Sequence, residues 1–549
     1  MVQHRNIPSG GAYSRQFTDY SGIFFDEFSE DSAWLRDEAR IRLPPLDGIR
    51  ALVLKGEFRP HPDARGMETR FPGLTAAING AAAGTISGSK PGPWELRIGL
   101  PGAGGPGRSV LSIGLSGVSR TNALAWLGRM TGLGFLQRFR KQNKNRQLRL
   151  FSLSTAAGET IYDFSQRHAP FSREFARRHA RLGINIVGFL TADLGIGESA
   201  RCMVRAADAA RIPAALVPLK LNCRNNLGDT TCQSRLQEDN PHGVNVIHLD
   251  PPASRDIDHH HGEAFRAAKY NVGYFAWELP EFPDAWLDCF DYFDEIWCPS
   301  EFTRAAIGLK SPLPVLAMPH AISVSPPGAN IAQLRARLGL PSGPFLFLTL
   351  FDLNSYIERK NPAAAIEAFR KAGFDPAAAG LVVKVQNAAG NAADFERLQA
   401  HLEGIPGAIL IAGTLHRQEV SALEAACDCF VSLHRAEGFG LAVAECMALG
   451  KPALCTDWSA TAEYVNSQNG CPVRARVVPL EQNHGPYSRG STWAEPDVEH
   501  AAEWMRTLAA DRALAARLGE CARSTIAARF SPDAIGARYR RRLEIVSAF

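Results

Sequence analysis

The sequence of 549 residues has no long apolar run. A helix that spans a membrane needs about 18–20 apolar residues in succession. The first residues, MVQHRNIPSGGAYSRQF, also lack the apolar stretch of a secretory signal. We therefore expect a cytoplasmic protein, with peripheral contact to the inner face of a membrane as an open alternative.

The chain also has little net charge and no regular cysteine pattern. A formal charge of +4 is small for this length, so the chain as a whole lacks the strongly basic character of a nucleic-acid-binding protein. The 11 cysteines are odd in number and scattered. Cys427 and Cys429 form CDC, whose spacing is not that of CxxC, so we interpret them as reduced core thiols rather than metal ligands.

Residues 1–155 differ in texture from the rest. Short apolar or alternating runs such as ALVLKG, WELRIGL and SVLSIGL are separated by turn signals, which favours a small antiparallel β-domain of the sandwich type. The basic segment 128–150 could lie on an acidic membrane surface, but a solvated connection is the favoured alternative. We expect a linker over residues 156–180.

From residue 181 the pattern changes to buried strands that alternate with amphipathic helices. This pattern predicts two doubly wound α/β domains, over residues 181–325 and 340–525, joined by the proline-containing linker SVSPPGANI. A last helix over residues 526–549 could pack back on the first of them. Two Rossmann-like units in tandem form a cleft, which is the expected ligand site.

The most informative stretch is HRAEGFGLAVAECMALGKPALCTDWSATAEYV, residues 434–465. It predicts a strand, a Gly-Phe-Gly turn, an apolar helix and a second strand, so the turn lies at the carboxyl end of a parallel sheet. The backbone N–H groups of Gly438, Phe439 and Gly440 would favour a phosphate at the start of the helix. Glu437 and Glu445 could accept hydrogen bonds from hydroxyl-rich groups on either side of it.

Five segments in one order carry a resemblance to a known family. They are GIGESAR (195–201), WELPEFPDAWLDCFDYFDEIWCPSEFTR (277–304), FDLNSYIERKNPAAAIEAF (351–369), the E-x7-E segment from Glu437 to Glu445, and WAEPD (493–497). Together they resemble a retaining glycosyltransferase of the GT-B fold, family 4 (glycosyl transferases group 1). The resemblance covers about two thirds of the chain and leaves the N-terminal β-domain as an addition.

The resemblance implies roles for these residues. Glu437 would face the transferred sugar, and Lys360 and Arg359 would stabilise the charge that grows on the leaving diphosphate. Glu445 would accept from the nucleotide ribose. The turn residues Gly438, Phe439, Gly440 and Leu441 and the loop glycines Gly195 and Gly197 would lie against the donor. The family often has a basic residue where this chain has Asn354, and Arg359 or Ser355 could compensate.

Other polar groups are weaker candidates. Glu278 is a candidate for the cleft wall, with helix capping as an equal alternative. His320 is favoured as a structural histidine. Asp256 and Asp258 spell DxD before three histidines, but no buried strand precedes them, so we interpret this segment as a surface loop. We expect no cofactor and no metal, because a helix terminus and Lys360 can replace a cation at the diphosphate.

The expected function is transfer of a sugar from a UDP- or GDP-linked donor to a glycan or lipid-linked acceptor in bacterial polysaccharide or lipopolysaccharide synthesis. Retention without a dedicated base fits the absence of a recognisable one. Two alternatives stay open. A nucleotide-sugar epimerase or a phosphorylase could use the same scaffold, and a non-catalytic carbohydrate-binding protein would use the β-domain.

Overall fold

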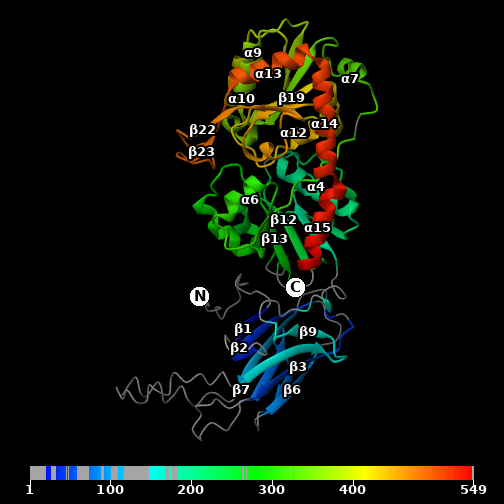
Figure 1. Cartoon of the computed structure of the whole chain (residues 1–549), viewed down its shortest axis with the longest axis vertical. Coiled ribbons are helices and arrows are strands. Elements are labelled where there is room, and N and C mark those ends of the chain that lie inside the picture. The colour runs from blue at the N-terminus through cyan, green and yellow to red at the C-terminus, as the bar shows by residue number, and fades with distance from the viewer. Residues whose placement is uncertain are drawn as a thin grey trace, which may run out of the picture.

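The computed structural model describes residues 20–25, 33–44, 46, 48–58, 73–87, 92–100, 109–116, 148–166, 172, 174–175, 182–223, 225–262, 265–266, 269–325 and 327–546. The chain forms three stacked bodies, a β-domain and two α/β domains, with the β-domain at one end (Figure 1). Residues 128–147 of the predicted basic segment 128–150 lie outside the described residues.

The expected antiparallel β-domain is present. Its strands alternate buried and exposed side chains, and the buried set forms one core. They make one sheet in the order β5-β4-β7-β2-β8-β3-β6, with β1 on β2 and β9 on β8. The outer strands β5 and β6 contact each other, so the sheet curls on itself, whereas a sandwich would have two facing sheets. Because β9 pairs with β8, this domain extends into the stretch 156–180 expected to be a linker. The strands are β1 (Tyr20–Phe25), β2 (Ala33–Leu43), β3 (Ala51–Phe58), β4 (Gly73–Ile78), β5 (Ala81–Ile86), β6 (Gly92–Gly99), β7 (Ser109–Ser116), β8 (Leu148–Thr155) and β9 (Thr160–Asp163).

The first α/β domain has a parallel sheet in the order β11-β10-β12-β13-β14-β15. Its strands are short and almost wholly apolar, as expected of strands covered on both faces. The order reverses at β10, so the loop after β10 stands at a switch point. The strands are β10 (Ile184–Gly188), β11 (Ala214–Pro218), β12 (Val244–His248), β13 (Tyr270–Tyr274), β14 (Glu295–Cys298) and β15 (Val315–Ala317), and the main helices are α4 (Gly195–Ala209), α5 (Ile257–His261) and α6 (Glu301–Gly308).

The second α/β domain has the order β18-β17-β16-β19-β20-β21, again parallel. Here the chain reverses between the neighbours β16 and β19, so the loops after these two strands meet at the switch point. The strands are β16 (Phe345–Asp352), β17 (Ala379–Gln386), β18 (Ala408–Ala412), β19 (Cys429–Ser432), β20 (Ala453–Thr456) and β21 (Gly470–Val473), and the helices are α7 (Ile331–Arg337), α8 (Ile357–Lys360), α9 (Pro362–Ala372), α10 (Ala392–Leu402), α11 (Arg417–Ala426), α12 (Leu441–Ala448) and α13 (Val498–Ala510).

A two-stranded hairpin, β22 (Ala475–Pro479) and β23 (Thr492–Pro496), projects from the second α/β domain (Figure 1). Leu480, Tyr487 and Trp493 from this hairpin and its loop are buried in a hydrophobic cluster that belongs mainly to the first α/β domain. The hairpin therefore bridges the two domains. The WAEPD segment includes most of β23.

The last two helices cross between the domains. α14 (Arg512–Phe530) packs on α12, and α15 (Pro532–Val546) packs on α4 of the first α/β domain (Figure 1). Tyr539 stacks on Trp297 at 5.4 Å between ring centroids. At the crossing, Ile322 N donates to Phe530 O at 2.7 Å. Within the described part of the chain no helix has the length and apolarity to cross a membrane.

Candidate active site

The Gly-Phe-Gly turn stands where the sequence predicts it, between β19 and α12. Gly440 has φ 87°, in the left-handed region, and a Cβ there would lie 2.8 Å from Thr461. Leu441 begins α12 and packs partly buried against the core. Glycine at 440 thus lets the chain turn sharply and present the helix start to the cleft.

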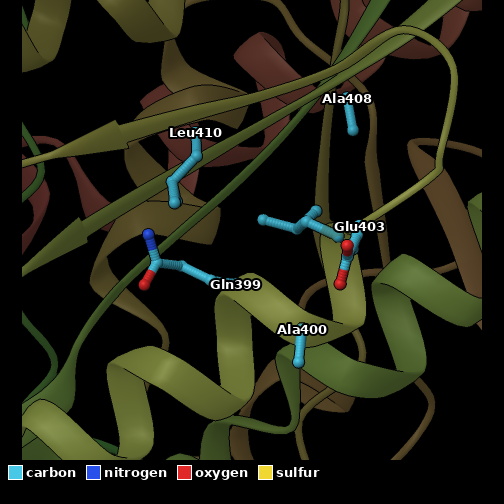
Figure 2. A pocket seen from close by; sticks show the side chains of 6 residues that line it. Gln399, Ala400, Glu403, Ala408 and Leu410 are labelled. Carbon is cyan, nitrogen blue, oxygen red and sulfur yellow. The ribbon is translucent and has the colours of Figure 1, made fainter.

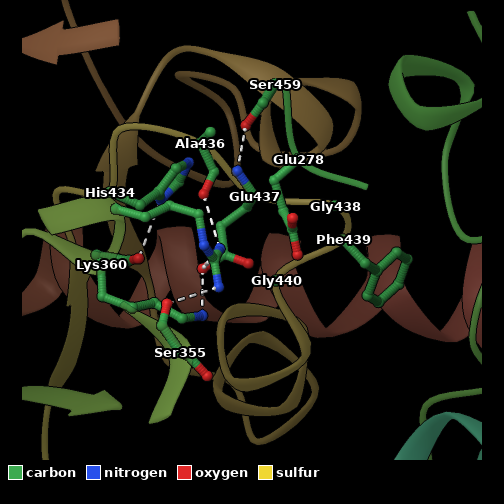
Figure 3. A network of polar contacts seen from close by, with 12 residues as sticks. Glu278, Ser355, Lys360, His434, Ala436, Glu437, Gly438, Phe439, Gly440 and Ser459 are labelled. Atoms are coloured by element: carbon green, nitrogen blue, oxygen red, sulfur yellow. Dashed lines mark hydrogen bonds and ion pairs between the residues drawn. The ribbon is translucent and has the colours of Figure 1, made fainter. Parts of the chain in front are cut away.

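Glu437 lies immediately before this turn and is 7% exposed. Lys360 Nζ donates to Glu437 Oε1, and Arg359 Nη1 lies 3.4 Å from the same oxygen (Figure 3). Arg359 and Lys360 lie in α8 after β16, and Glu437 lies in the loop after β19; the switch point makes these two segments neighbours. The predicted grouping of Glu437, Lys360 and Arg359 is therefore present.

The ionisation of this group follows from its charges. Burial raises the pKa of Glu437, but Lys360 and then Arg359 lower it more, to about 2. Burial lowers the pKa of Arg359, while Tyr487, Glu278 and Glu437 together raise it above its ordinary value. Glu437 is thus a carboxylate across the physiological range, held by two cations.

Arg359 is directed inward. Its Nη1 donates to Ala436 O at 2.9 Å and its Nη2 to Ser355 O at 3.3 Å, while its buried Nε meets no acceptor in the described structure. Ser355 contributes its carbonyl to this contact. The side chain of Lys360 is 24% exposed and that of Arg359 is 6% exposed, so Lys360 is the more accessible cation.

The first α/β domain faces this group with Glu278. A Cβ on Gly438 would lie 3.2 Å from Trp277 O and 3.7 Å from Glu278 Cγ. Glu278 accepts from Tyr487 Oη at 2.9 Å. Glu278 thus lies close to Glu437, where the two α/β domains meet (Figure 3), and its place in a cleft wall stays a prediction.

Glu445 lies on α12 and is 5% exposed. Arg417, at the start of α11, binds it with both terminal nitrogens, one at 3.1 Å. The buried carboxyl of Glu424 lies beside Glu445 and meets no hydrogen-bond donor in the described residues. Burial, and next Glu445, raise the pKa of Glu424 well above its ordinary value. Glu445 is therefore flanked by one cation and by a buried carboxyl whose charged form is disfavoured.

The glycine loop after β10 reaches the same region. Gly197 is required by packing, because a Cβ there would lie 2.6 Å from Phe189 O, whereas Gly195 has open space. Glu198 on α4 pairs with Arg201 at 2.8 Å and with Arg205 at 2.5 Å. Burial raises the pKa of Glu198, but Arg205, Arg201 and Arg417 lower it to about 2. Glu198 and Arg417 thus couple the two domains electrostatically.

A set of amide side chains lies at the carboxyl ends of β16 and β17, around the carboxylate of Asp352. Asp352 accepts from Asn387 at 2.7 Å, from Gln386 at 2.9 Å and, across the cleft, from Asn225 at 3.2 Å. Asn354, in the position of the family's basic residue, accepts from Asn391 at 2.9 Å. We call these residues the amide cluster: Asn225, Asp352, Asn354, Gln386, Asn387 and Asn391.

Lys384 lies behind this cluster. It is 2% exposed, and its Nζ donates to Gln386 Oε1 at 3.4 Å. Burial lowers its pKa to about 8, although Asp352 and Asp193 act to raise it. It is a buried cation near the cleft that sequence reasoning missed.

The three weaker candidates from the sequence are His320, Asp256 and Asp258. His320 is 6% exposed and contacts Tyr274 Oη at 3.2 Å, and burial lowers its pKa to about 3. Asp256 ends a 3-10 helix and Asp258 lies in α5, so this segment is helical and the expected surface loop is wrong. Asp258 binds Arg266. The segment PPASRD forms a 3-10 helix rather than a loop, because proline fits the first turn of a helix.

The described residues contain no cluster that could bind a metal ion, and their cysteines are unpaired. No group of three or more histidine, cysteine or acidic side chains there could hold a metal ion. All eleven cysteines are unpaired, and all but Cys223 and Cys521 are buried. Burial raises the pKa of both Cys427 and Cys429. These thiols are core residues.

A cavity of about 550 Å³ lies elsewhere, between α10 and the edge strand β18. It is lined by Gln399, Ala400, Leu402, Glu403, Ala408 and Leu410 (Figure 2). None of the predicted site residues lines it.

Other residues around this group were not predicted from sequence. Ser459, with φ 62°, accepts from Glu437 N at 3.0 Å, and His434 contacts Thr461 Oγ1 at 3.1 Å. Burial lowers the pKa of His434 to about 4. Tyr487 and Arg417 are far along the chain from the residues they hold, so no local pattern marks them. Of these residues, His434 has a local signal in the sequence, because it is the first residue of the segment 434–465.

Comparison with known proteins agrees with this geometry. Residues 330–525 match the family model described as "Glycosyl transferases group 1". The crystal structure of Anabaena Alr3699/HepE in complex with UDP and glucose is similar over 66% of this chain and 100% of that chain, with 15% identity and a TM-score of 0.51. A glycosyltransferase from Rickettsia africae ESF-5 is similar over 67% of this chain and 99% of that chain, with 12% identity and a TM-score of 0.50. Curated protein sequences give no match.

The fold and the matched domain define the class: this is a glycosyltransferase with the GT-B fold. The region that matches the family model includes α8, the Gly-Phe-Gly turn and α12. The β-domain lies outside the region that matches the family model.

Proposed function

We propose that the protein transfers a sugar from a nucleotide-sugar donor to a glycan or lipid-linked acceptor, with retention of configuration, in bacterial polysaccharide or lipopolysaccharide assembly. The observation that carries this proposal is the pairing of Lys360 and Arg359 with Glu437 beside the start of α12. Two cations and a helix start offer positive charge to a diphosphate at one point.

The charge arrangement supports a division of labour. Lys360 is the more exposed cation and would bind the leaving diphosphate, where negative charge develops. Arg359 is tied to Ala436 O and Ser355 O, so it would hold the loop and Glu437 in place. Glu437, a carboxylate with a pKa of about 2, would accept from hydroxyls of the transferred sugar.

The nucleotide would extend along α12. Glu445 is expected to accept from ribose hydroxyls, and Arg417 would hold its carboxylate in position. A bound UDP and glucose in the Anabaena structure support a UDP-linked donor for this fold. Cations at the diphosphate supply charge that a metal would otherwise supply, so we propose metal-independent transfer. A cytoplasmic location, with the acceptor presented at the membrane, belongs to the same proposal.

Glu278 and the bridging hairpin would close the site. Tyr487 ties Glu278 to the second domain, and closure excludes water that would hydrolyse the donor. No side chain near Glu437 is placed as a dedicated base among the described residues: His434 is buried and hydrogen-bonded to Ser432 and Thr461. A β-phosphate oxygen would take the acceptor proton in this proposal.

The test compares the wild type with Lys360→Ala and Glu437→Ala in two measurements. Calorimetry measures the binding of UDP, GDP, ADP and several nucleotide sugars, with and without EDTA. An activity assay measures sugar transfer. We expect one nucleotide to bind, EDTA to have no effect, and each variant to lower transfer at least about 100-fold. Leu309→Ala, at an exposed position after α6, is the matched control. Near-normal transfer in both variants would contradict the site, and release of an isomer without acceptor would favour the epimerase alternative.

A further inference from the structure

Tyr356 is an exposed aromatic ring at the cleft. It is 39% exposed and is the one aromatic residue among the exposed large apolar side chains of the described structure. It directly precedes α8, and its carbonyl accepts from the N–H groups of Arg359 at 3.1 Å and Lys360 at 3.2 Å. The ring therefore projects from the segment that holds the two cations.

The backbone at Tyr356 is strained. Its φ is 62° and its ψ is 104°, a conformation that bulky L-residues rarely adopt. Such outliers persist only when the surroundings enforce them, and they concentrate at functional positions. A glycine would adopt this conformation freely. The chain instead has a tyrosine here, despite the backbone strain that its side chain brings.

The bridging hairpin holds the ring in place. A Cβ on Gly485 would lie 2.1 Å from Tyr356 Cε1, so only glycine lets the hairpin loop approach the ring. Tyr487 meets Tyr356 edge to face at 5.5 Å between ring centroids. The ring is fixed on this side and keeps exposed surface elsewhere.

Polar groups that suit hydroxyls adjoin the ring along the chain. Asn354 and Ser355 precede it, and Asn354 is exposed and belongs to the amide cluster. The same cluster includes Asn225 from the opposite wall of the cleft. Carboxamides donate and accept at once, as sugar hydroxyls do.

We propose that Tyr356 is the stacking platform of a carbohydrate subsite, with the amide cluster as its hydrogen-bonding rim. A pyranose has an apolar C–H face that packs on an aromatic ring and hydroxyls at its edge that suit the amides. This inference rests on the proposed function and names its acceptor as a pyranose. A nucleobase is less suited, because the nucleotide is assigned to α12, along which Glu445 lies more than one turn beyond the Gly-Phe-Gly turn.

The experiment is saturation-transfer NMR of the full chain with the methyl α- and β-pyranosides of glucose, galactose and mannose. An excess of UDP is present to fill the nucleotide site. We expect at least one pyranoside to be saturated through its ring C–H protons. Tyr356→Phe should keep this signal, and Tyr356→Ala should weaken it about tenfold. Val477→Ala, an exposed position on the same hairpin, is the matched control.

Nucleotide binding by calorimetry on the same variants separates the two proposals. If UDP and GDP both fail to bind the wild type, the proposed function fails. If a nucleotide binds but no pyranoside is saturated, or Tyr356→Ala keeps the full signal, the subsite is refuted. Equal loss in Tyr356→Phe and Tyr356→Ala would also refute stacking. Loss of nucleotide binding in Tyr356→Ala, with the pyranoside signal unchanged, would assign the ring to a nucleobase and refute the subsite.

Discussion

Glu437→Gln offers a quantitative test of the charges at the candidate site. The substitution keeps the shape of the side chain and removes the carboxylate that Lys360 and Arg359 hold. The pKa of Glu437 falls from 4.5 to about 2 on folding. At about 1.36 kcal/mol for each unit, the ionised group contributes about 3 kcal/mol to stability at neutral pH.

The pH dependence has a defined sign. Because the folded pKa is depressed, the contribution is complete above the unfolded pKa of 4.5 and is lost as the pH falls toward 2. The stability difference between wild type and Glu437→Gln should therefore be constant from pH 8 to pH 5 and shrink below that. The loss of one partner leaves Arg359 buried and poorly paired, which acts in the same direction at neutral pH.

The assay is urea unfolding of the wild type and of Glu437→Gln, followed by circular dichroism at pH 7 and at pH 3. Labelling of the buried Cys429, Cys446 and Cys455 by a thiol reagent reports opening of the second α/β domain at pH 7 only, because the thiolate is the form that reacts. A difference below about 1 kcal/mol at pH 7, or one equally large at pH 3, would refute the reasoning.

Three further predictions concern other parts of the molecule. Glu424→Gln should leave stability unchanged at pH 5 and raise it relative to wild type at pH 8, in thermal melts, because the raised pKa of Glu424 makes its burial increasingly unfavourable as pH rises above its ordinary value. Glu463 accepts from the N–H groups of Glu301 at 3.2 Å and Phe302 at 2.7 Å across the cleft, so Glu463→Ala should favour open forms by about 1–3 kcal/mol, seen as a larger radius of gyration in solution scattering. Gly536→Ala would place a Cβ 2.3 Å from Ala206 O and should cost about 1–3 kcal/mol in melts, whereas Gly308→Ala, with open space, should not.

The sequence carried enough information for the α/β domains and for the centre of the site. Short apolar strands that alternate with amphipathic helices predict both parallel sheets, and the strand order then brings the loops after β16 and β19 together. Glu437, Lys360 and Arg359 could be grouped because each lies in a segment whose position relative to a strand end is legible.

The rest depended on contacts between distant segments. Nothing local to Arg417 indicates that it binds Glu445, and nothing local to Tyr487 indicates that it reaches Glu278. The curled single sheet of the β-domain differs from the expected sandwich because strand alternation reports which side is buried and not which edges meet. The roles assigned to the site residues stay predictions.

The double crossing between the α/β domains limits how they can move. The chain passes from the first domain to the second after Ile322 and returns after Phe530, and the hydrogen bond between these residues joins both passages at one place. α15 is held on the first α/β domain by its packing on α4 and by Tyr539, which stacks on Trp297 of β14. Because both passages of the chain meet at this one place, the opening that admits a donor would be a pivot about it, in which the contacts of the bridging hairpin and of Glu463 would separate.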